Sequence, residues 1–589
     1  MVKKEKLKEI KLTGIAASPG IAIGPAHIYS EEKYIIPNYK IDSKEVEKEI
    51  KRFESALSKT KRELNNLRKE FLKKVKTNEL DFFAVHFLIL DDPYIEKEVI
   101  TEIVDNHKNA EWALYEVVNK YLKNLKSLKD EYLSERAADI QDLAKRLMNN
   151  LIKKQPKPKL QLENAVVLIA RDLTPTDTAS MEKEKILGFV TELGGSTSHT
   201  AIVARALEIP AVVGIQNVFD FVSENNTIIV DGNHGVIIIN PNEKTLKEYK
   251  TAKSVFEKFS EELKKIRYLQ PVTTDRKYIR IAGNIEINEE VDSVITHGGE
   301  GIGLFRTEFL YLNRTELPTE NELFNIFKEA VEKMKPYEVI FRTLDAGGDK
   351  IGGSIKNFQE ANPFLGYRAI RFCFDNIDIF KTQLRAILRA SYFGNGKIMF
   401  PMISSVDEIR QIKKILNSVK ESLRKEGKNF KEDIELGAMI EIPSAAITSD
   451  ILAKEVSFFS IGTNDLVQYT LAVDRNNPKI SYLYEPFHPA IIKLIKQVVE
   501  NAHKNNVEVH ICGELAADPM AAILFIGMDV DVLSMSAINI PEIKKLIRSI
   551  SYNEANEILN QVLKLETAQN VKELLHKFLK EKAPDLLKE

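Results

Sequence analysis

The chain has 589 residues, of which 84 are Lys or Arg and 86 are Asp or Glu, so its formal net charge is −2. Near neutrality disfavours a nucleic-acid or membrane-surface partner, because such binders carry a sustained excess of basic residues. The two cysteines, Cys373 and Cys512, exclude a disulfide framework, and no apolar run reaches the length of a membrane span, so we expect a cytoplasmic protein of several domains with no membrane insertion.

The first long pattern is helical. From residue 43 to 71 apolar side chains recur at three- and four-residue steps with charges between them, and similar patterns cover 82–90, 94–105, 110–128 and 131–152. Consecutive helices joined by short turns predict a bundle. The basic, proline-punctuated stretch 153–159 cannot continue a helix, so a domain boundary is expected there.

Short β-branched runs follow the bundle, at 165–170, 187–191, 211–214, 227–231 and 235–240, and they predict a compact α/β domain. The first 30 residues also have a strand and turn pattern. We expect them to pack with this domain, which makes the bundle an insertion. A charged helical segment with a thin apolar stripe, 241–269, then connects to the rest of the chain.

The last part of the chain alternates strand and helix patterns. Eight apolar runs separated by amphipathic segments predict a (β/α)8 barrel. The active site of such a barrel lies at the carboxyl ends of its strands. The runs are 279–284, 301–308, 339–345, 397–402, 437–441, 458–464, 509–514 and 530–536.

Polar residues concentrate at the ends of these runs. Guanidinium groups suit phosphate and carboxylate, so Arg306, Arg342 and Arg475 are the candidate phosphate ligands. Glu441 and Asp465 end adjacent runs and could share a divalent cation, and an oxygen pair without histidine or thiolate favours magnesium or manganese over zinc. The expected ligand is an anion with both phosphate and carboxylate.

Two residues of the run 509–514 have open interpretations. Cys512 is either a buried small hydrophobic residue or, because of its place at the rim, a thiol that hands a proton to a carbanion-like centre. We expect His510 to alternate to the opposite side from Cys512 and to serve in packing.

A second constellation surrounds His199. A glycine pair at 194–195 ends a strand, hydroxyl side chains offer a helix N-cap, and an apolar helical pattern begins directly after the histidine. A lone histidine is usually structural. At a helix start, however, free amides would receive a phosphoryl group on the imidazole, and the helix dipole keeps the ring neutral and nucleophilic.

Together, the segments GGSTSHTAIVARALEIPAVVG (194–214), GIGLFRT (301–307), NPFLGYRAIR (362–371), KIMFPMI (397–403) and FFSIGTNDLVQYTLAVDR (458–475) resemble enzyme I of the sugar phosphotransferase system, the phosphoenolpyruvate-protein phosphotransferases. The resemblance covers nearly the whole chain. It implies that phosphoenolpyruvate (PEP) binds in the barrel with magnesium, passes its phosphoryl group to His199 and leaves as pyruvate after protonation by Cys512.

The resemblance also implies roles for further residues. The substrate-site residues it matches are Arg306, Arg342, Arg368, Asn464, Arg475 and Cys512, and the metal ligands are Glu441 and Asp465. Thr178 matches a threonine that bonds the active histidine. Ser196 departs from the family pattern, where many relatives carry arginine, which puts a minor phosphate contact in doubt.

The domain organisation that follows is a swivelling phosphohistidine α/β domain (1–35 and 154–240) with an inserted helical bundle (36–153) that docks the carrier protein HPr. A linker helix (241–270) precedes a C-terminal barrel (271–589) that binds PEP and forms a homodimer. Because His199 has to visit both the barrel and the carrier, we expect hinge motion in the linkers.

Two rival functions share part of this pattern. A pyruvate-phosphate dikinase or PEP synthase shares the phosphohistidine and barrel modules but needs a nucleotide-binding region, and here a bundle without a glycine-rich phosphate loop takes that place. A noncatalytic scaffold tends to lose charged site residues, because unpaired buried charges destabilise a fold, and all the candidates are intact.

Overall fold

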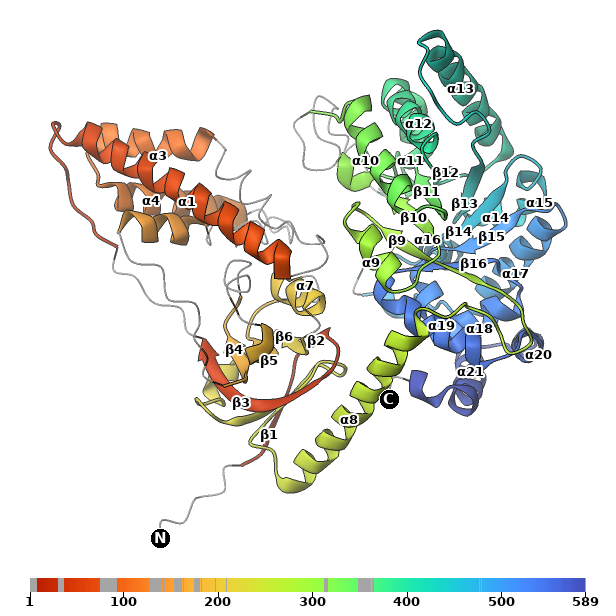
Figure 1. The fold of residues 1–589 in the computed structure, drawn as a ribbon, viewed down its shortest axis with the longest axis horizontal. Helices are drawn as coiled ribbons and strands as arrows, with labels where there is room; N and C mark the ends of the chain where they lie inside the picture. The colour runs from red at the N-terminus through yellow and green to blue at the C-terminus, as the bar shows by residue number, and fades with distance from the viewer. Residues whose placement is uncertain are drawn as a thin grey trace. The chain divides into compact units, whose positions relative to one another are not determined.

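The protein is described here from a computed structural model (Figure 1). The structure describes residues 8–29, 36–74, 93–127, 140, 143–152, 162, 164–173, 181, 183–195, 198–207, 209–311, 316–347, 362, 365–475, 477 and 479–587. The chain divides into two compact units, Met1–Lys258 and Phe259–Glu589. The predicted helix at 82–90 and the linker 153–159 lie outside the described residues.

The first unit is built on an eight-stranded sheet in the order β1-β8-β7-β3-β4-β5-β6-β2. Its strands are β1 (Ile10–Thr13), β2 (Ile15–Ser18), β3 (Ile21–Tyr29), β4 (Val166–Ala170), β5 (Ile186–Thr191), β6 (Ala211–Val213), β7 (Thr227–Asp231) and β8 (Val236–Ile239). The three N-terminal strands belong to this sheet, as expected, and β3 runs parallel to β4 even though more than a hundred residues separate them in sequence.

The residues between β3 and β4 contain the helices α1 (Val46–Lys74), α3 (Pro93–Asn106) and α4 (Ala110–Ser127), which pack against one another as the predicted bundle. Residues 143–151 are helical as well. One hydrophobic cluster joins the bundle, through Phe53, Val99 and Leu114, to the sheet face that carries Leu168 and Phe189. The opposite sheet face has its own cluster. The short helix α7 (His199–Ala206) lies between β5 and β6 in sequence and packs on β2.

The helix α8 (Glu243–Ile266) spans the division between the units. Leu246 and Tyr249 in its first half pack against β-strand residues of the first unit, whereas Phe259 packs against the core of the second. The apolar stripe expected for residues 241–269 therefore serves two different cores.

The second unit is a closed barrel of eight parallel strands, as predicted (Figure 1). The strands are β9 (Arg280–Ile285), β10 (Ile302–Arg306), β11 (Glu338–Arg342), β12 (Asn395–Phe400), β13 (Leu436–Ile440), β14 (Phe458–Ile461), β15 (Glu508–Ile511) and β16 (Val532–Met535). Strand β16 pairs with β9 and closes the barrel. Parallel strands place all their carboxyl ends at one mouth.

Helices surround the strands because their apolar faces repeat with helical period. In α13, for example, Ile409, Ile412, Leu416, Val419 and Leu423 are buried, and a capping box formed by Ser405 and Glu408 starts the helix. The other helices are α9 (Glu290–Thr296), α10 (Glu320–Lys333), α11 (Ala369–Asp375), α12 (Ile377–Ser391), α13 (Val406–Lys425), α14 (Pro443–Ile447), α15 (Ser449–Leu452), α16 (Thr463–Leu471), α17 (Pro489–His503), α18 (Pro519–Gly527), α19 (Ile540–Ser549), α20 (Tyr552–Val562) and α21 (Ala568–Lys582).

At the end of the barrel opposite the mouth lies a network of paired charges, of which Lys397 and Glu338 are buried and Glu508 is partly exposed. Lys397 is 2.8 Å from a carboxylate oxygen of Glu338, and Arg280 contacts both Glu338 at 3.1 Å and Glu508 at 2.8 Å. Because charges of both signs meet there, none of these ions is buried without a partner. The charge network therefore occupies the amino-terminal end of the barrel, and the candidate site lies at the carboxyl-terminal mouth.

Candidate active site

The mouth of the barrel holds a lattice of arginines and carboxylates. Arg342, the last residue of β11, places Nη2 3.1 Å from Glu308 Oε2 and Nη1 3.1 Å from Asp345 Oδ2. Arg368, which precedes α11, donates to Asp345 Oδ1 from Nη2 at 2.7 Å and from Nε at 3.0 Å. Asp345 therefore ties two guanidinium groups together, and its side chain is only 3% exposed.

The carboxylate Glu441 directly follows β13 and is buried. Its Oε1 accepts a hydrogen bond of 2.6 Å from the backbone amide of Met402. A Cβ atom at Gly462 would lie 2.9 Å from Oε2, so glycine leaves the space that this carboxylate occupies. Burial, followed by the nearby carboxylates Asp345 and Asp465, raises the pKa of Glu441 to about 8.

Asp465 lies in the first turn of α16 and faces two arginines. Its Oδ2 is 3.7 Å from Arg368 Nη1, and its Oδ1 is 3.9 Å from Arg475 Nη2. The run 458–464 was expected to end as a strand at Asn464, but β14 stops at Ile461 and the chain turns into helix after Gly462. Asn464 and Asp465 reach the mouth from a helix start, where amides favour negative charge.

Cys512 follows β15 and points into the barrel. It is 3% exposed and clusters with Leu304, Ile340, Met399, Met439 and Phe458. Burial raises the pKa of the thiol to about 11, although Ser460, Arg342 and Arg306 each act in the opposite direction. The thiol therefore keeps its proton at neutral pH. Cys512 is buried and also lies within electrostatic reach of Arg342 and Arg306 at the mouth, and its role as a proton donor stays a prediction.

The expectation for His510 was wrong. His510 stacks on Phe458 with ring centroids 5.3 Å apart, and Phe458 belongs to the same interior cluster as Cys512. Residues two apart in a strand share a face, so His510 lies on the same side as Cys512. It nevertheless serves in packing, since it is fully buried and its Nε2 lies 3.5 Å from Glu508.

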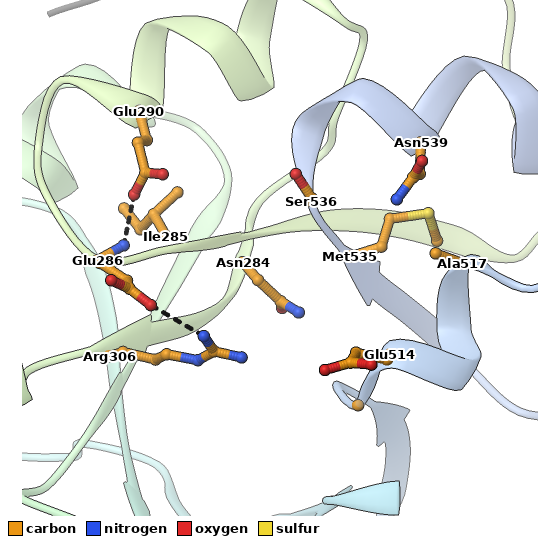
Figure 2. A pocket seen from close by; sticks show the side chains of 11 residues that line it. Asn284, Ile285, Glu286, Glu290, Arg306, Glu514, Ala517, Met535, Ser536 and Asn539 are labelled. Carbon is orange, nitrogen blue, oxygen red and sulfur yellow. Dashed lines mark hydrogen bonds and ion pairs between the residues drawn. The ribbon is translucent and has the colours of Figure 1, made fainter. Parts of the chain in front are cut away.

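Beside this lattice, a cavity of about 400 Å³ opens among β9, β10, β15 and β16 (Figure 2). Arg306, at the end of β10, donates to Glu286 Oε1 at 2.9 Å on one wall, and Glu514 lies on the other. Sequence reasoning gave Glu286, Glu290 and Asn539 no role. Strand alternation could have identified Glu286, because it lies two residues beyond Asn284 and therefore on the same face of the chain.

Asn464 connects the cavity to the arginine lattice. Its Nδ2 donates to Glu514 Oε1 at 3.1 Å, and its Oδ1 accepts from the Glu514 amide at 3.0 Å. Asn284 holds the neighbouring wall by donating to the backbone carbonyls of Cys512 and Ser534. The structure thus brings together Arg306, Arg342, Arg368, Glu441, Asn464, Asp465, Arg475 and Cys512.

In the first unit, α7 begins at His199, as predicted. Ser198 has extended backbone geometry and is the N-cap, with its hydroxyl accepting from the Ala201 amide at 3.4 Å. Gly194 precedes the cap with a φ of +107°, in the region that favours glycine. Thr178 and Ser196 lie outside the described residues.

The described residues contain no helix long and apolar enough to cross a membrane. Cys373 and Cys512 are both free thiols. Within the same described part of the chain no group of three His, Cys, Asp or Glu side chains has metal-site geometry, and Asp465 is linked to Asp345 through Arg368.

The parallel barrel with arginines and carboxylates at its mouth is the arrangement that the sequence led us to expect, and the comparison with known families identifies its class. A family model described as PEP-utilising enzyme, PEP-binding domain, matches residues 238–552. Two others, the N-terminal domain and the mobile domain of PEP-utilising enzymes, match 13–136 and 162–235. The chain is therefore a PEP-utilising enzyme.

Similarity to individual proteins identifies the family within the PEP-utilising enzymes. The phosphoenolpyruvate-protein phosphotransferase of Staphylococcus carnosus is 43% identical over 97% of this chain and 99% of its own. That of Listeria innocua is 44% identical over 98% and 100%, and that of Priestia megaterium 44% over 96% and 98%. The chain belongs to the phosphoenolpyruvate-protein phosphotransferase family, which confirms the resemblance found in the sequence.

Proposed function

We propose that the chain transfers the phosphoryl group of PEP to its own His199 and then to a histidine of the carrier HPr, releasing pyruvate as the first step of sugar uptake by the phosphotransferase system. One observation supports this most strongly: Arg342 and Arg368 meet at the carboxylate of Asp345, inside the mouth of a barrel whose relatives are named for this reaction. PEP carries the phosphate and the carboxylate that such a cationic mouth binds.

Phosphoryl transfer mainly requires that the protein align the reacting groups and stabilise the charge on the transferred phosphoryl group. Arg306, Arg342, Arg368 and Arg475 supply the positive charge, and Asn464 supplies an amide to orient the substrate. The substrate has to compete with Glu286 for Arg306 and with Asp465 for Arg475, since these carboxylates hold the guanidinium groups in its absence. Binding therefore exchanges internal ion pairs for substrate contacts.

We infer that Glu441 and Asp465 would hold a divalent cation. Burial, followed by the nearby carboxylates Asp345 and Asp465, raises the pKa of Glu441, and such a group of carboxylates would be stabilised by a bound cation. Oxygen donors without histidine or thiolate favour magnesium or manganese. When bound, the cation neutralises charge on the phosphate and carboxylate of PEP. Glu441 and Asp465 are the residues that would hold it.

Cys512 is the proposed proton donor. When the phosphoryl group leaves, the bond between phosphorus and the enol oxygen breaks and a bond to a nitrogen of His199 forms, which leaves the enolate of pyruvate. A thiol that stays protonated at neutral pH can then give its proton to C3, so the S–H bond breaks and a C–H bond forms. The result is pyruvate and a Cys512 thiolate.

His199 opens α7, so unpaired amides at the helix start favour the negative charge of a phosphoryl group on the imidazole. Thr178 is the proposed hydrogen-bond partner of that ring. The His199 imidazole has to reach both the barrel mouth and HPr, and we propose that HPr docks on the helical bundle of residues 36–153. Motion through the linker 241–270 moves the imidazole between these two positions. We also propose that a homodimer forms through the barrel. The free cysteines suit a reducing cytoplasm.

The test is labelling with radioactive phosphate. The purified chain is incubated with magnesium and either labelled PEP or labelled ATP, then with HPr, and acid-labile phosphate is followed on both proteins. We expect label from PEP alone, no label in His199→Ala, and normal label in His234→Ala, a matched histidine of the same unit. Transfer from ATP to His199, or an HPr labelled by His199→Ala, would contradict the proposal.

A further inference from the structure

A buried amide side chain on a surrounding helix links the ends of two barrel strands. Gln383 on α12 is 1% exposed, and its Oε1 accepts a hydrogen bond of 3.0 Å from the Leu344 amide. Its Nε2 donates to Thr307 Oγ1 at 2.9 Å. Thr307 directly follows Arg306 at the end of β10. Leu344 comes two residues after Arg342, the last residue of β11. Both hydrogen bonds that Gln383 makes among the described residues therefore lead to segments that carry candidate phosphate ligands.

Thr307 continues this link to Arg342. Thr307 is fully buried, and its hydroxyl donates to the backbone carbonyl of Arg342 at 2.8 Å. A hydroxyl has one proton, so towards Gln383 it can only accept, whereas the Leu344 amide can only donate. The side chain of Gln383 matches both partners in one orientation alone. A flipped amide would place its NH2 against the Leu344 N–H and its oxygen against a hydroxyl whose proton is already used.

The register of the two strands shows what this link holds. Arg306 and Arg342 are opposite each other in the parallel pair of β10 and β11. Just beyond these ends, the Asp345 amide donates to Glu308 Oε1 at 2.9 Å. The bonds through Gln383 act at the same level, directly after the last paired residues. They hold the two strand ends, and with them the two arginines, at a fixed separation.

Losing the amide would leave two buried polar groups without their partners. Leu344 is 1% exposed and Thr307 is fully buried, so water does not readily replace Gln383 there. A buried donor or acceptor that loses its bond costs the free energy of its desolvation. The strand ends would shift to find other partners. A displacement of about 1 Å in groups that position a substrate can change a rate by about two orders of magnitude.

We propose that Gln383 is a positioning residue for PEP binding, which fixes the separation of the β10 and β11 ends so that Arg306 and Arg342 meet the same anion. This inference rests on the proposed function. Gln383 acts through Thr307 and Leu344 and needs no contact of its own with the substrate. Its role is therefore in the affinity for PEP, and not in the chemistry at His199.

The KM for PEP in phosphohistidine formation tests this role. Gln383→Met keeps the length of the side chain but loses the donor and the carbonyl acceptor, so KM should rise about tenfold or more. Phosphorylation of His199 from phosphorylated HPr should stay within about twofold, because that transfer uses no barrel arginine. Ser391→Ala is the matched control. Ser391 is a buried residue of the same helix, its hydroxyl donates to the Ile387 carbonyl, and its KM should change less than twofold.

A second pair of variants tests the link from the other side. Thr307→Ser keeps the hydroxyl and should keep KM within about twofold, whereas Thr307→Val should raise KM as Gln383→Met does. Combining Thr307→Val with Gln383→Met should add little to the larger single effect, because both remove the same chain of bonds. This pair decides the question if Gln383→Met does not fold.

Urea unfolding of every variant separates positioning from stability. A less stable Gln383→Met with unchanged KM, or equal KM values in Thr307→Val and Thr307→Ser, would overturn the inference. An equal slowing of the transfer from phosphorylated HPr would do the same, since it would indicate general damage. If the unaltered chain forms no phosphohistidine from PEP, the proposed function itself is wrong, which is distinct from these outcomes, and the inference falls with it.

Discussion

Asp345 and Arg368 form the tightest ion pair in the described part of the barrel mouth, with Oδ1 2.7 Å from Nη2 and 3.0 Å from Nε. The same carboxylate faces Arg342 through its other oxygen. A planar guanidinium held by two of its nitrogens has a defined orientation, which a lysine cannot reproduce. Asp345 thus orients Arg342 and Arg368, two of the arginines that we propose bind PEP.

Arg368→Lys should therefore weaken PEP binding by about tenfold or more, because the ammonium loses the fork that Asp345 orients. Arg371→Lys is the matched control. Arg371 lies in α11, the helix that Arg368 precedes, and among the described residues it donates only to the backbone carbonyls of Leu365 and Gly366, so less than a twofold change is expected. The measurement is the KM for PEP in phosphohistidine formation. Equal effects in the two variants would argue against a substrate role for Arg368.

Cys512→Ala should slow pyruvate formation much more than it weakens PEP binding. The proton donor is lost, whereas the arginine and carboxylate contacts remain. Pyruvate release and phosphohistidine yield are measured on the same samples, with Cys373→Ala, the other buried thiol, as the control. Unchanged turnover in Cys512→Ala would leave this cysteine as a buried hydrophobic residue only.

Gly194→Ala should destabilise the first unit by about 1–2 kcal/mol, because alanine is strained at a positive φ. Its Cβ would also lie 2.9 Å from the Ser198 hydroxyl that caps α7. Gly195→Ala is a close control, since a Cβ there meets nothing within 4 Å. Urea unfolding of the two variants gives the comparison. If Gly195→Ala were the more destabilised, the account of the α7 cap would be wrong.

Glu508→Gln should reduce stability at neutral pH and have progressively less effect in acid. A hydrogen bond from His510, with Arg280 and Lys397 nearby, lowers the pKa of Glu508 from 4.5 to about 2 in the folded chain. A carboxyl group with a lowered pKa contributes stability above about pH 4.5, and this contribution is lost as the pH falls towards 2.

Because almost half of the Glu508 side chain is exposed, the loss at pH 7 should be about 1 kcal/mol. Urea titrations between pH 7 and pH 3 measure the difference between the wild type and Glu508→Gln. The exposed Glu421→Gln provides the control. A difference that widened in acid would contradict the assignment of this pKa.

Much of the architecture could be predicted from local patterns. Eight apolar runs separated by amphipathic segments give the barrel, and β-branched runs with the first 30 residues give the sheet of the first unit. These predictions succeed because strand alternation and helical period depend on residues close in sequence. The helix start at His199 follows in the same way from the glycine pair and the hydroxyl before it.

Which side chains meet was decided only by the tertiary structure. Closing the barrel brings residues from distant strands to one mouth, so Asp345 rather than a metal-ligand candidate joins Arg342 to Arg368, and Glu286 holds Arg306. The interior layer likewise sets Cys512 in one cluster with Leu304, although the two residues are far apart in the chain. No local period encodes such a pair, because strand pairing and burial, and not spacing along the chain, determine the environment that sets its chemistry.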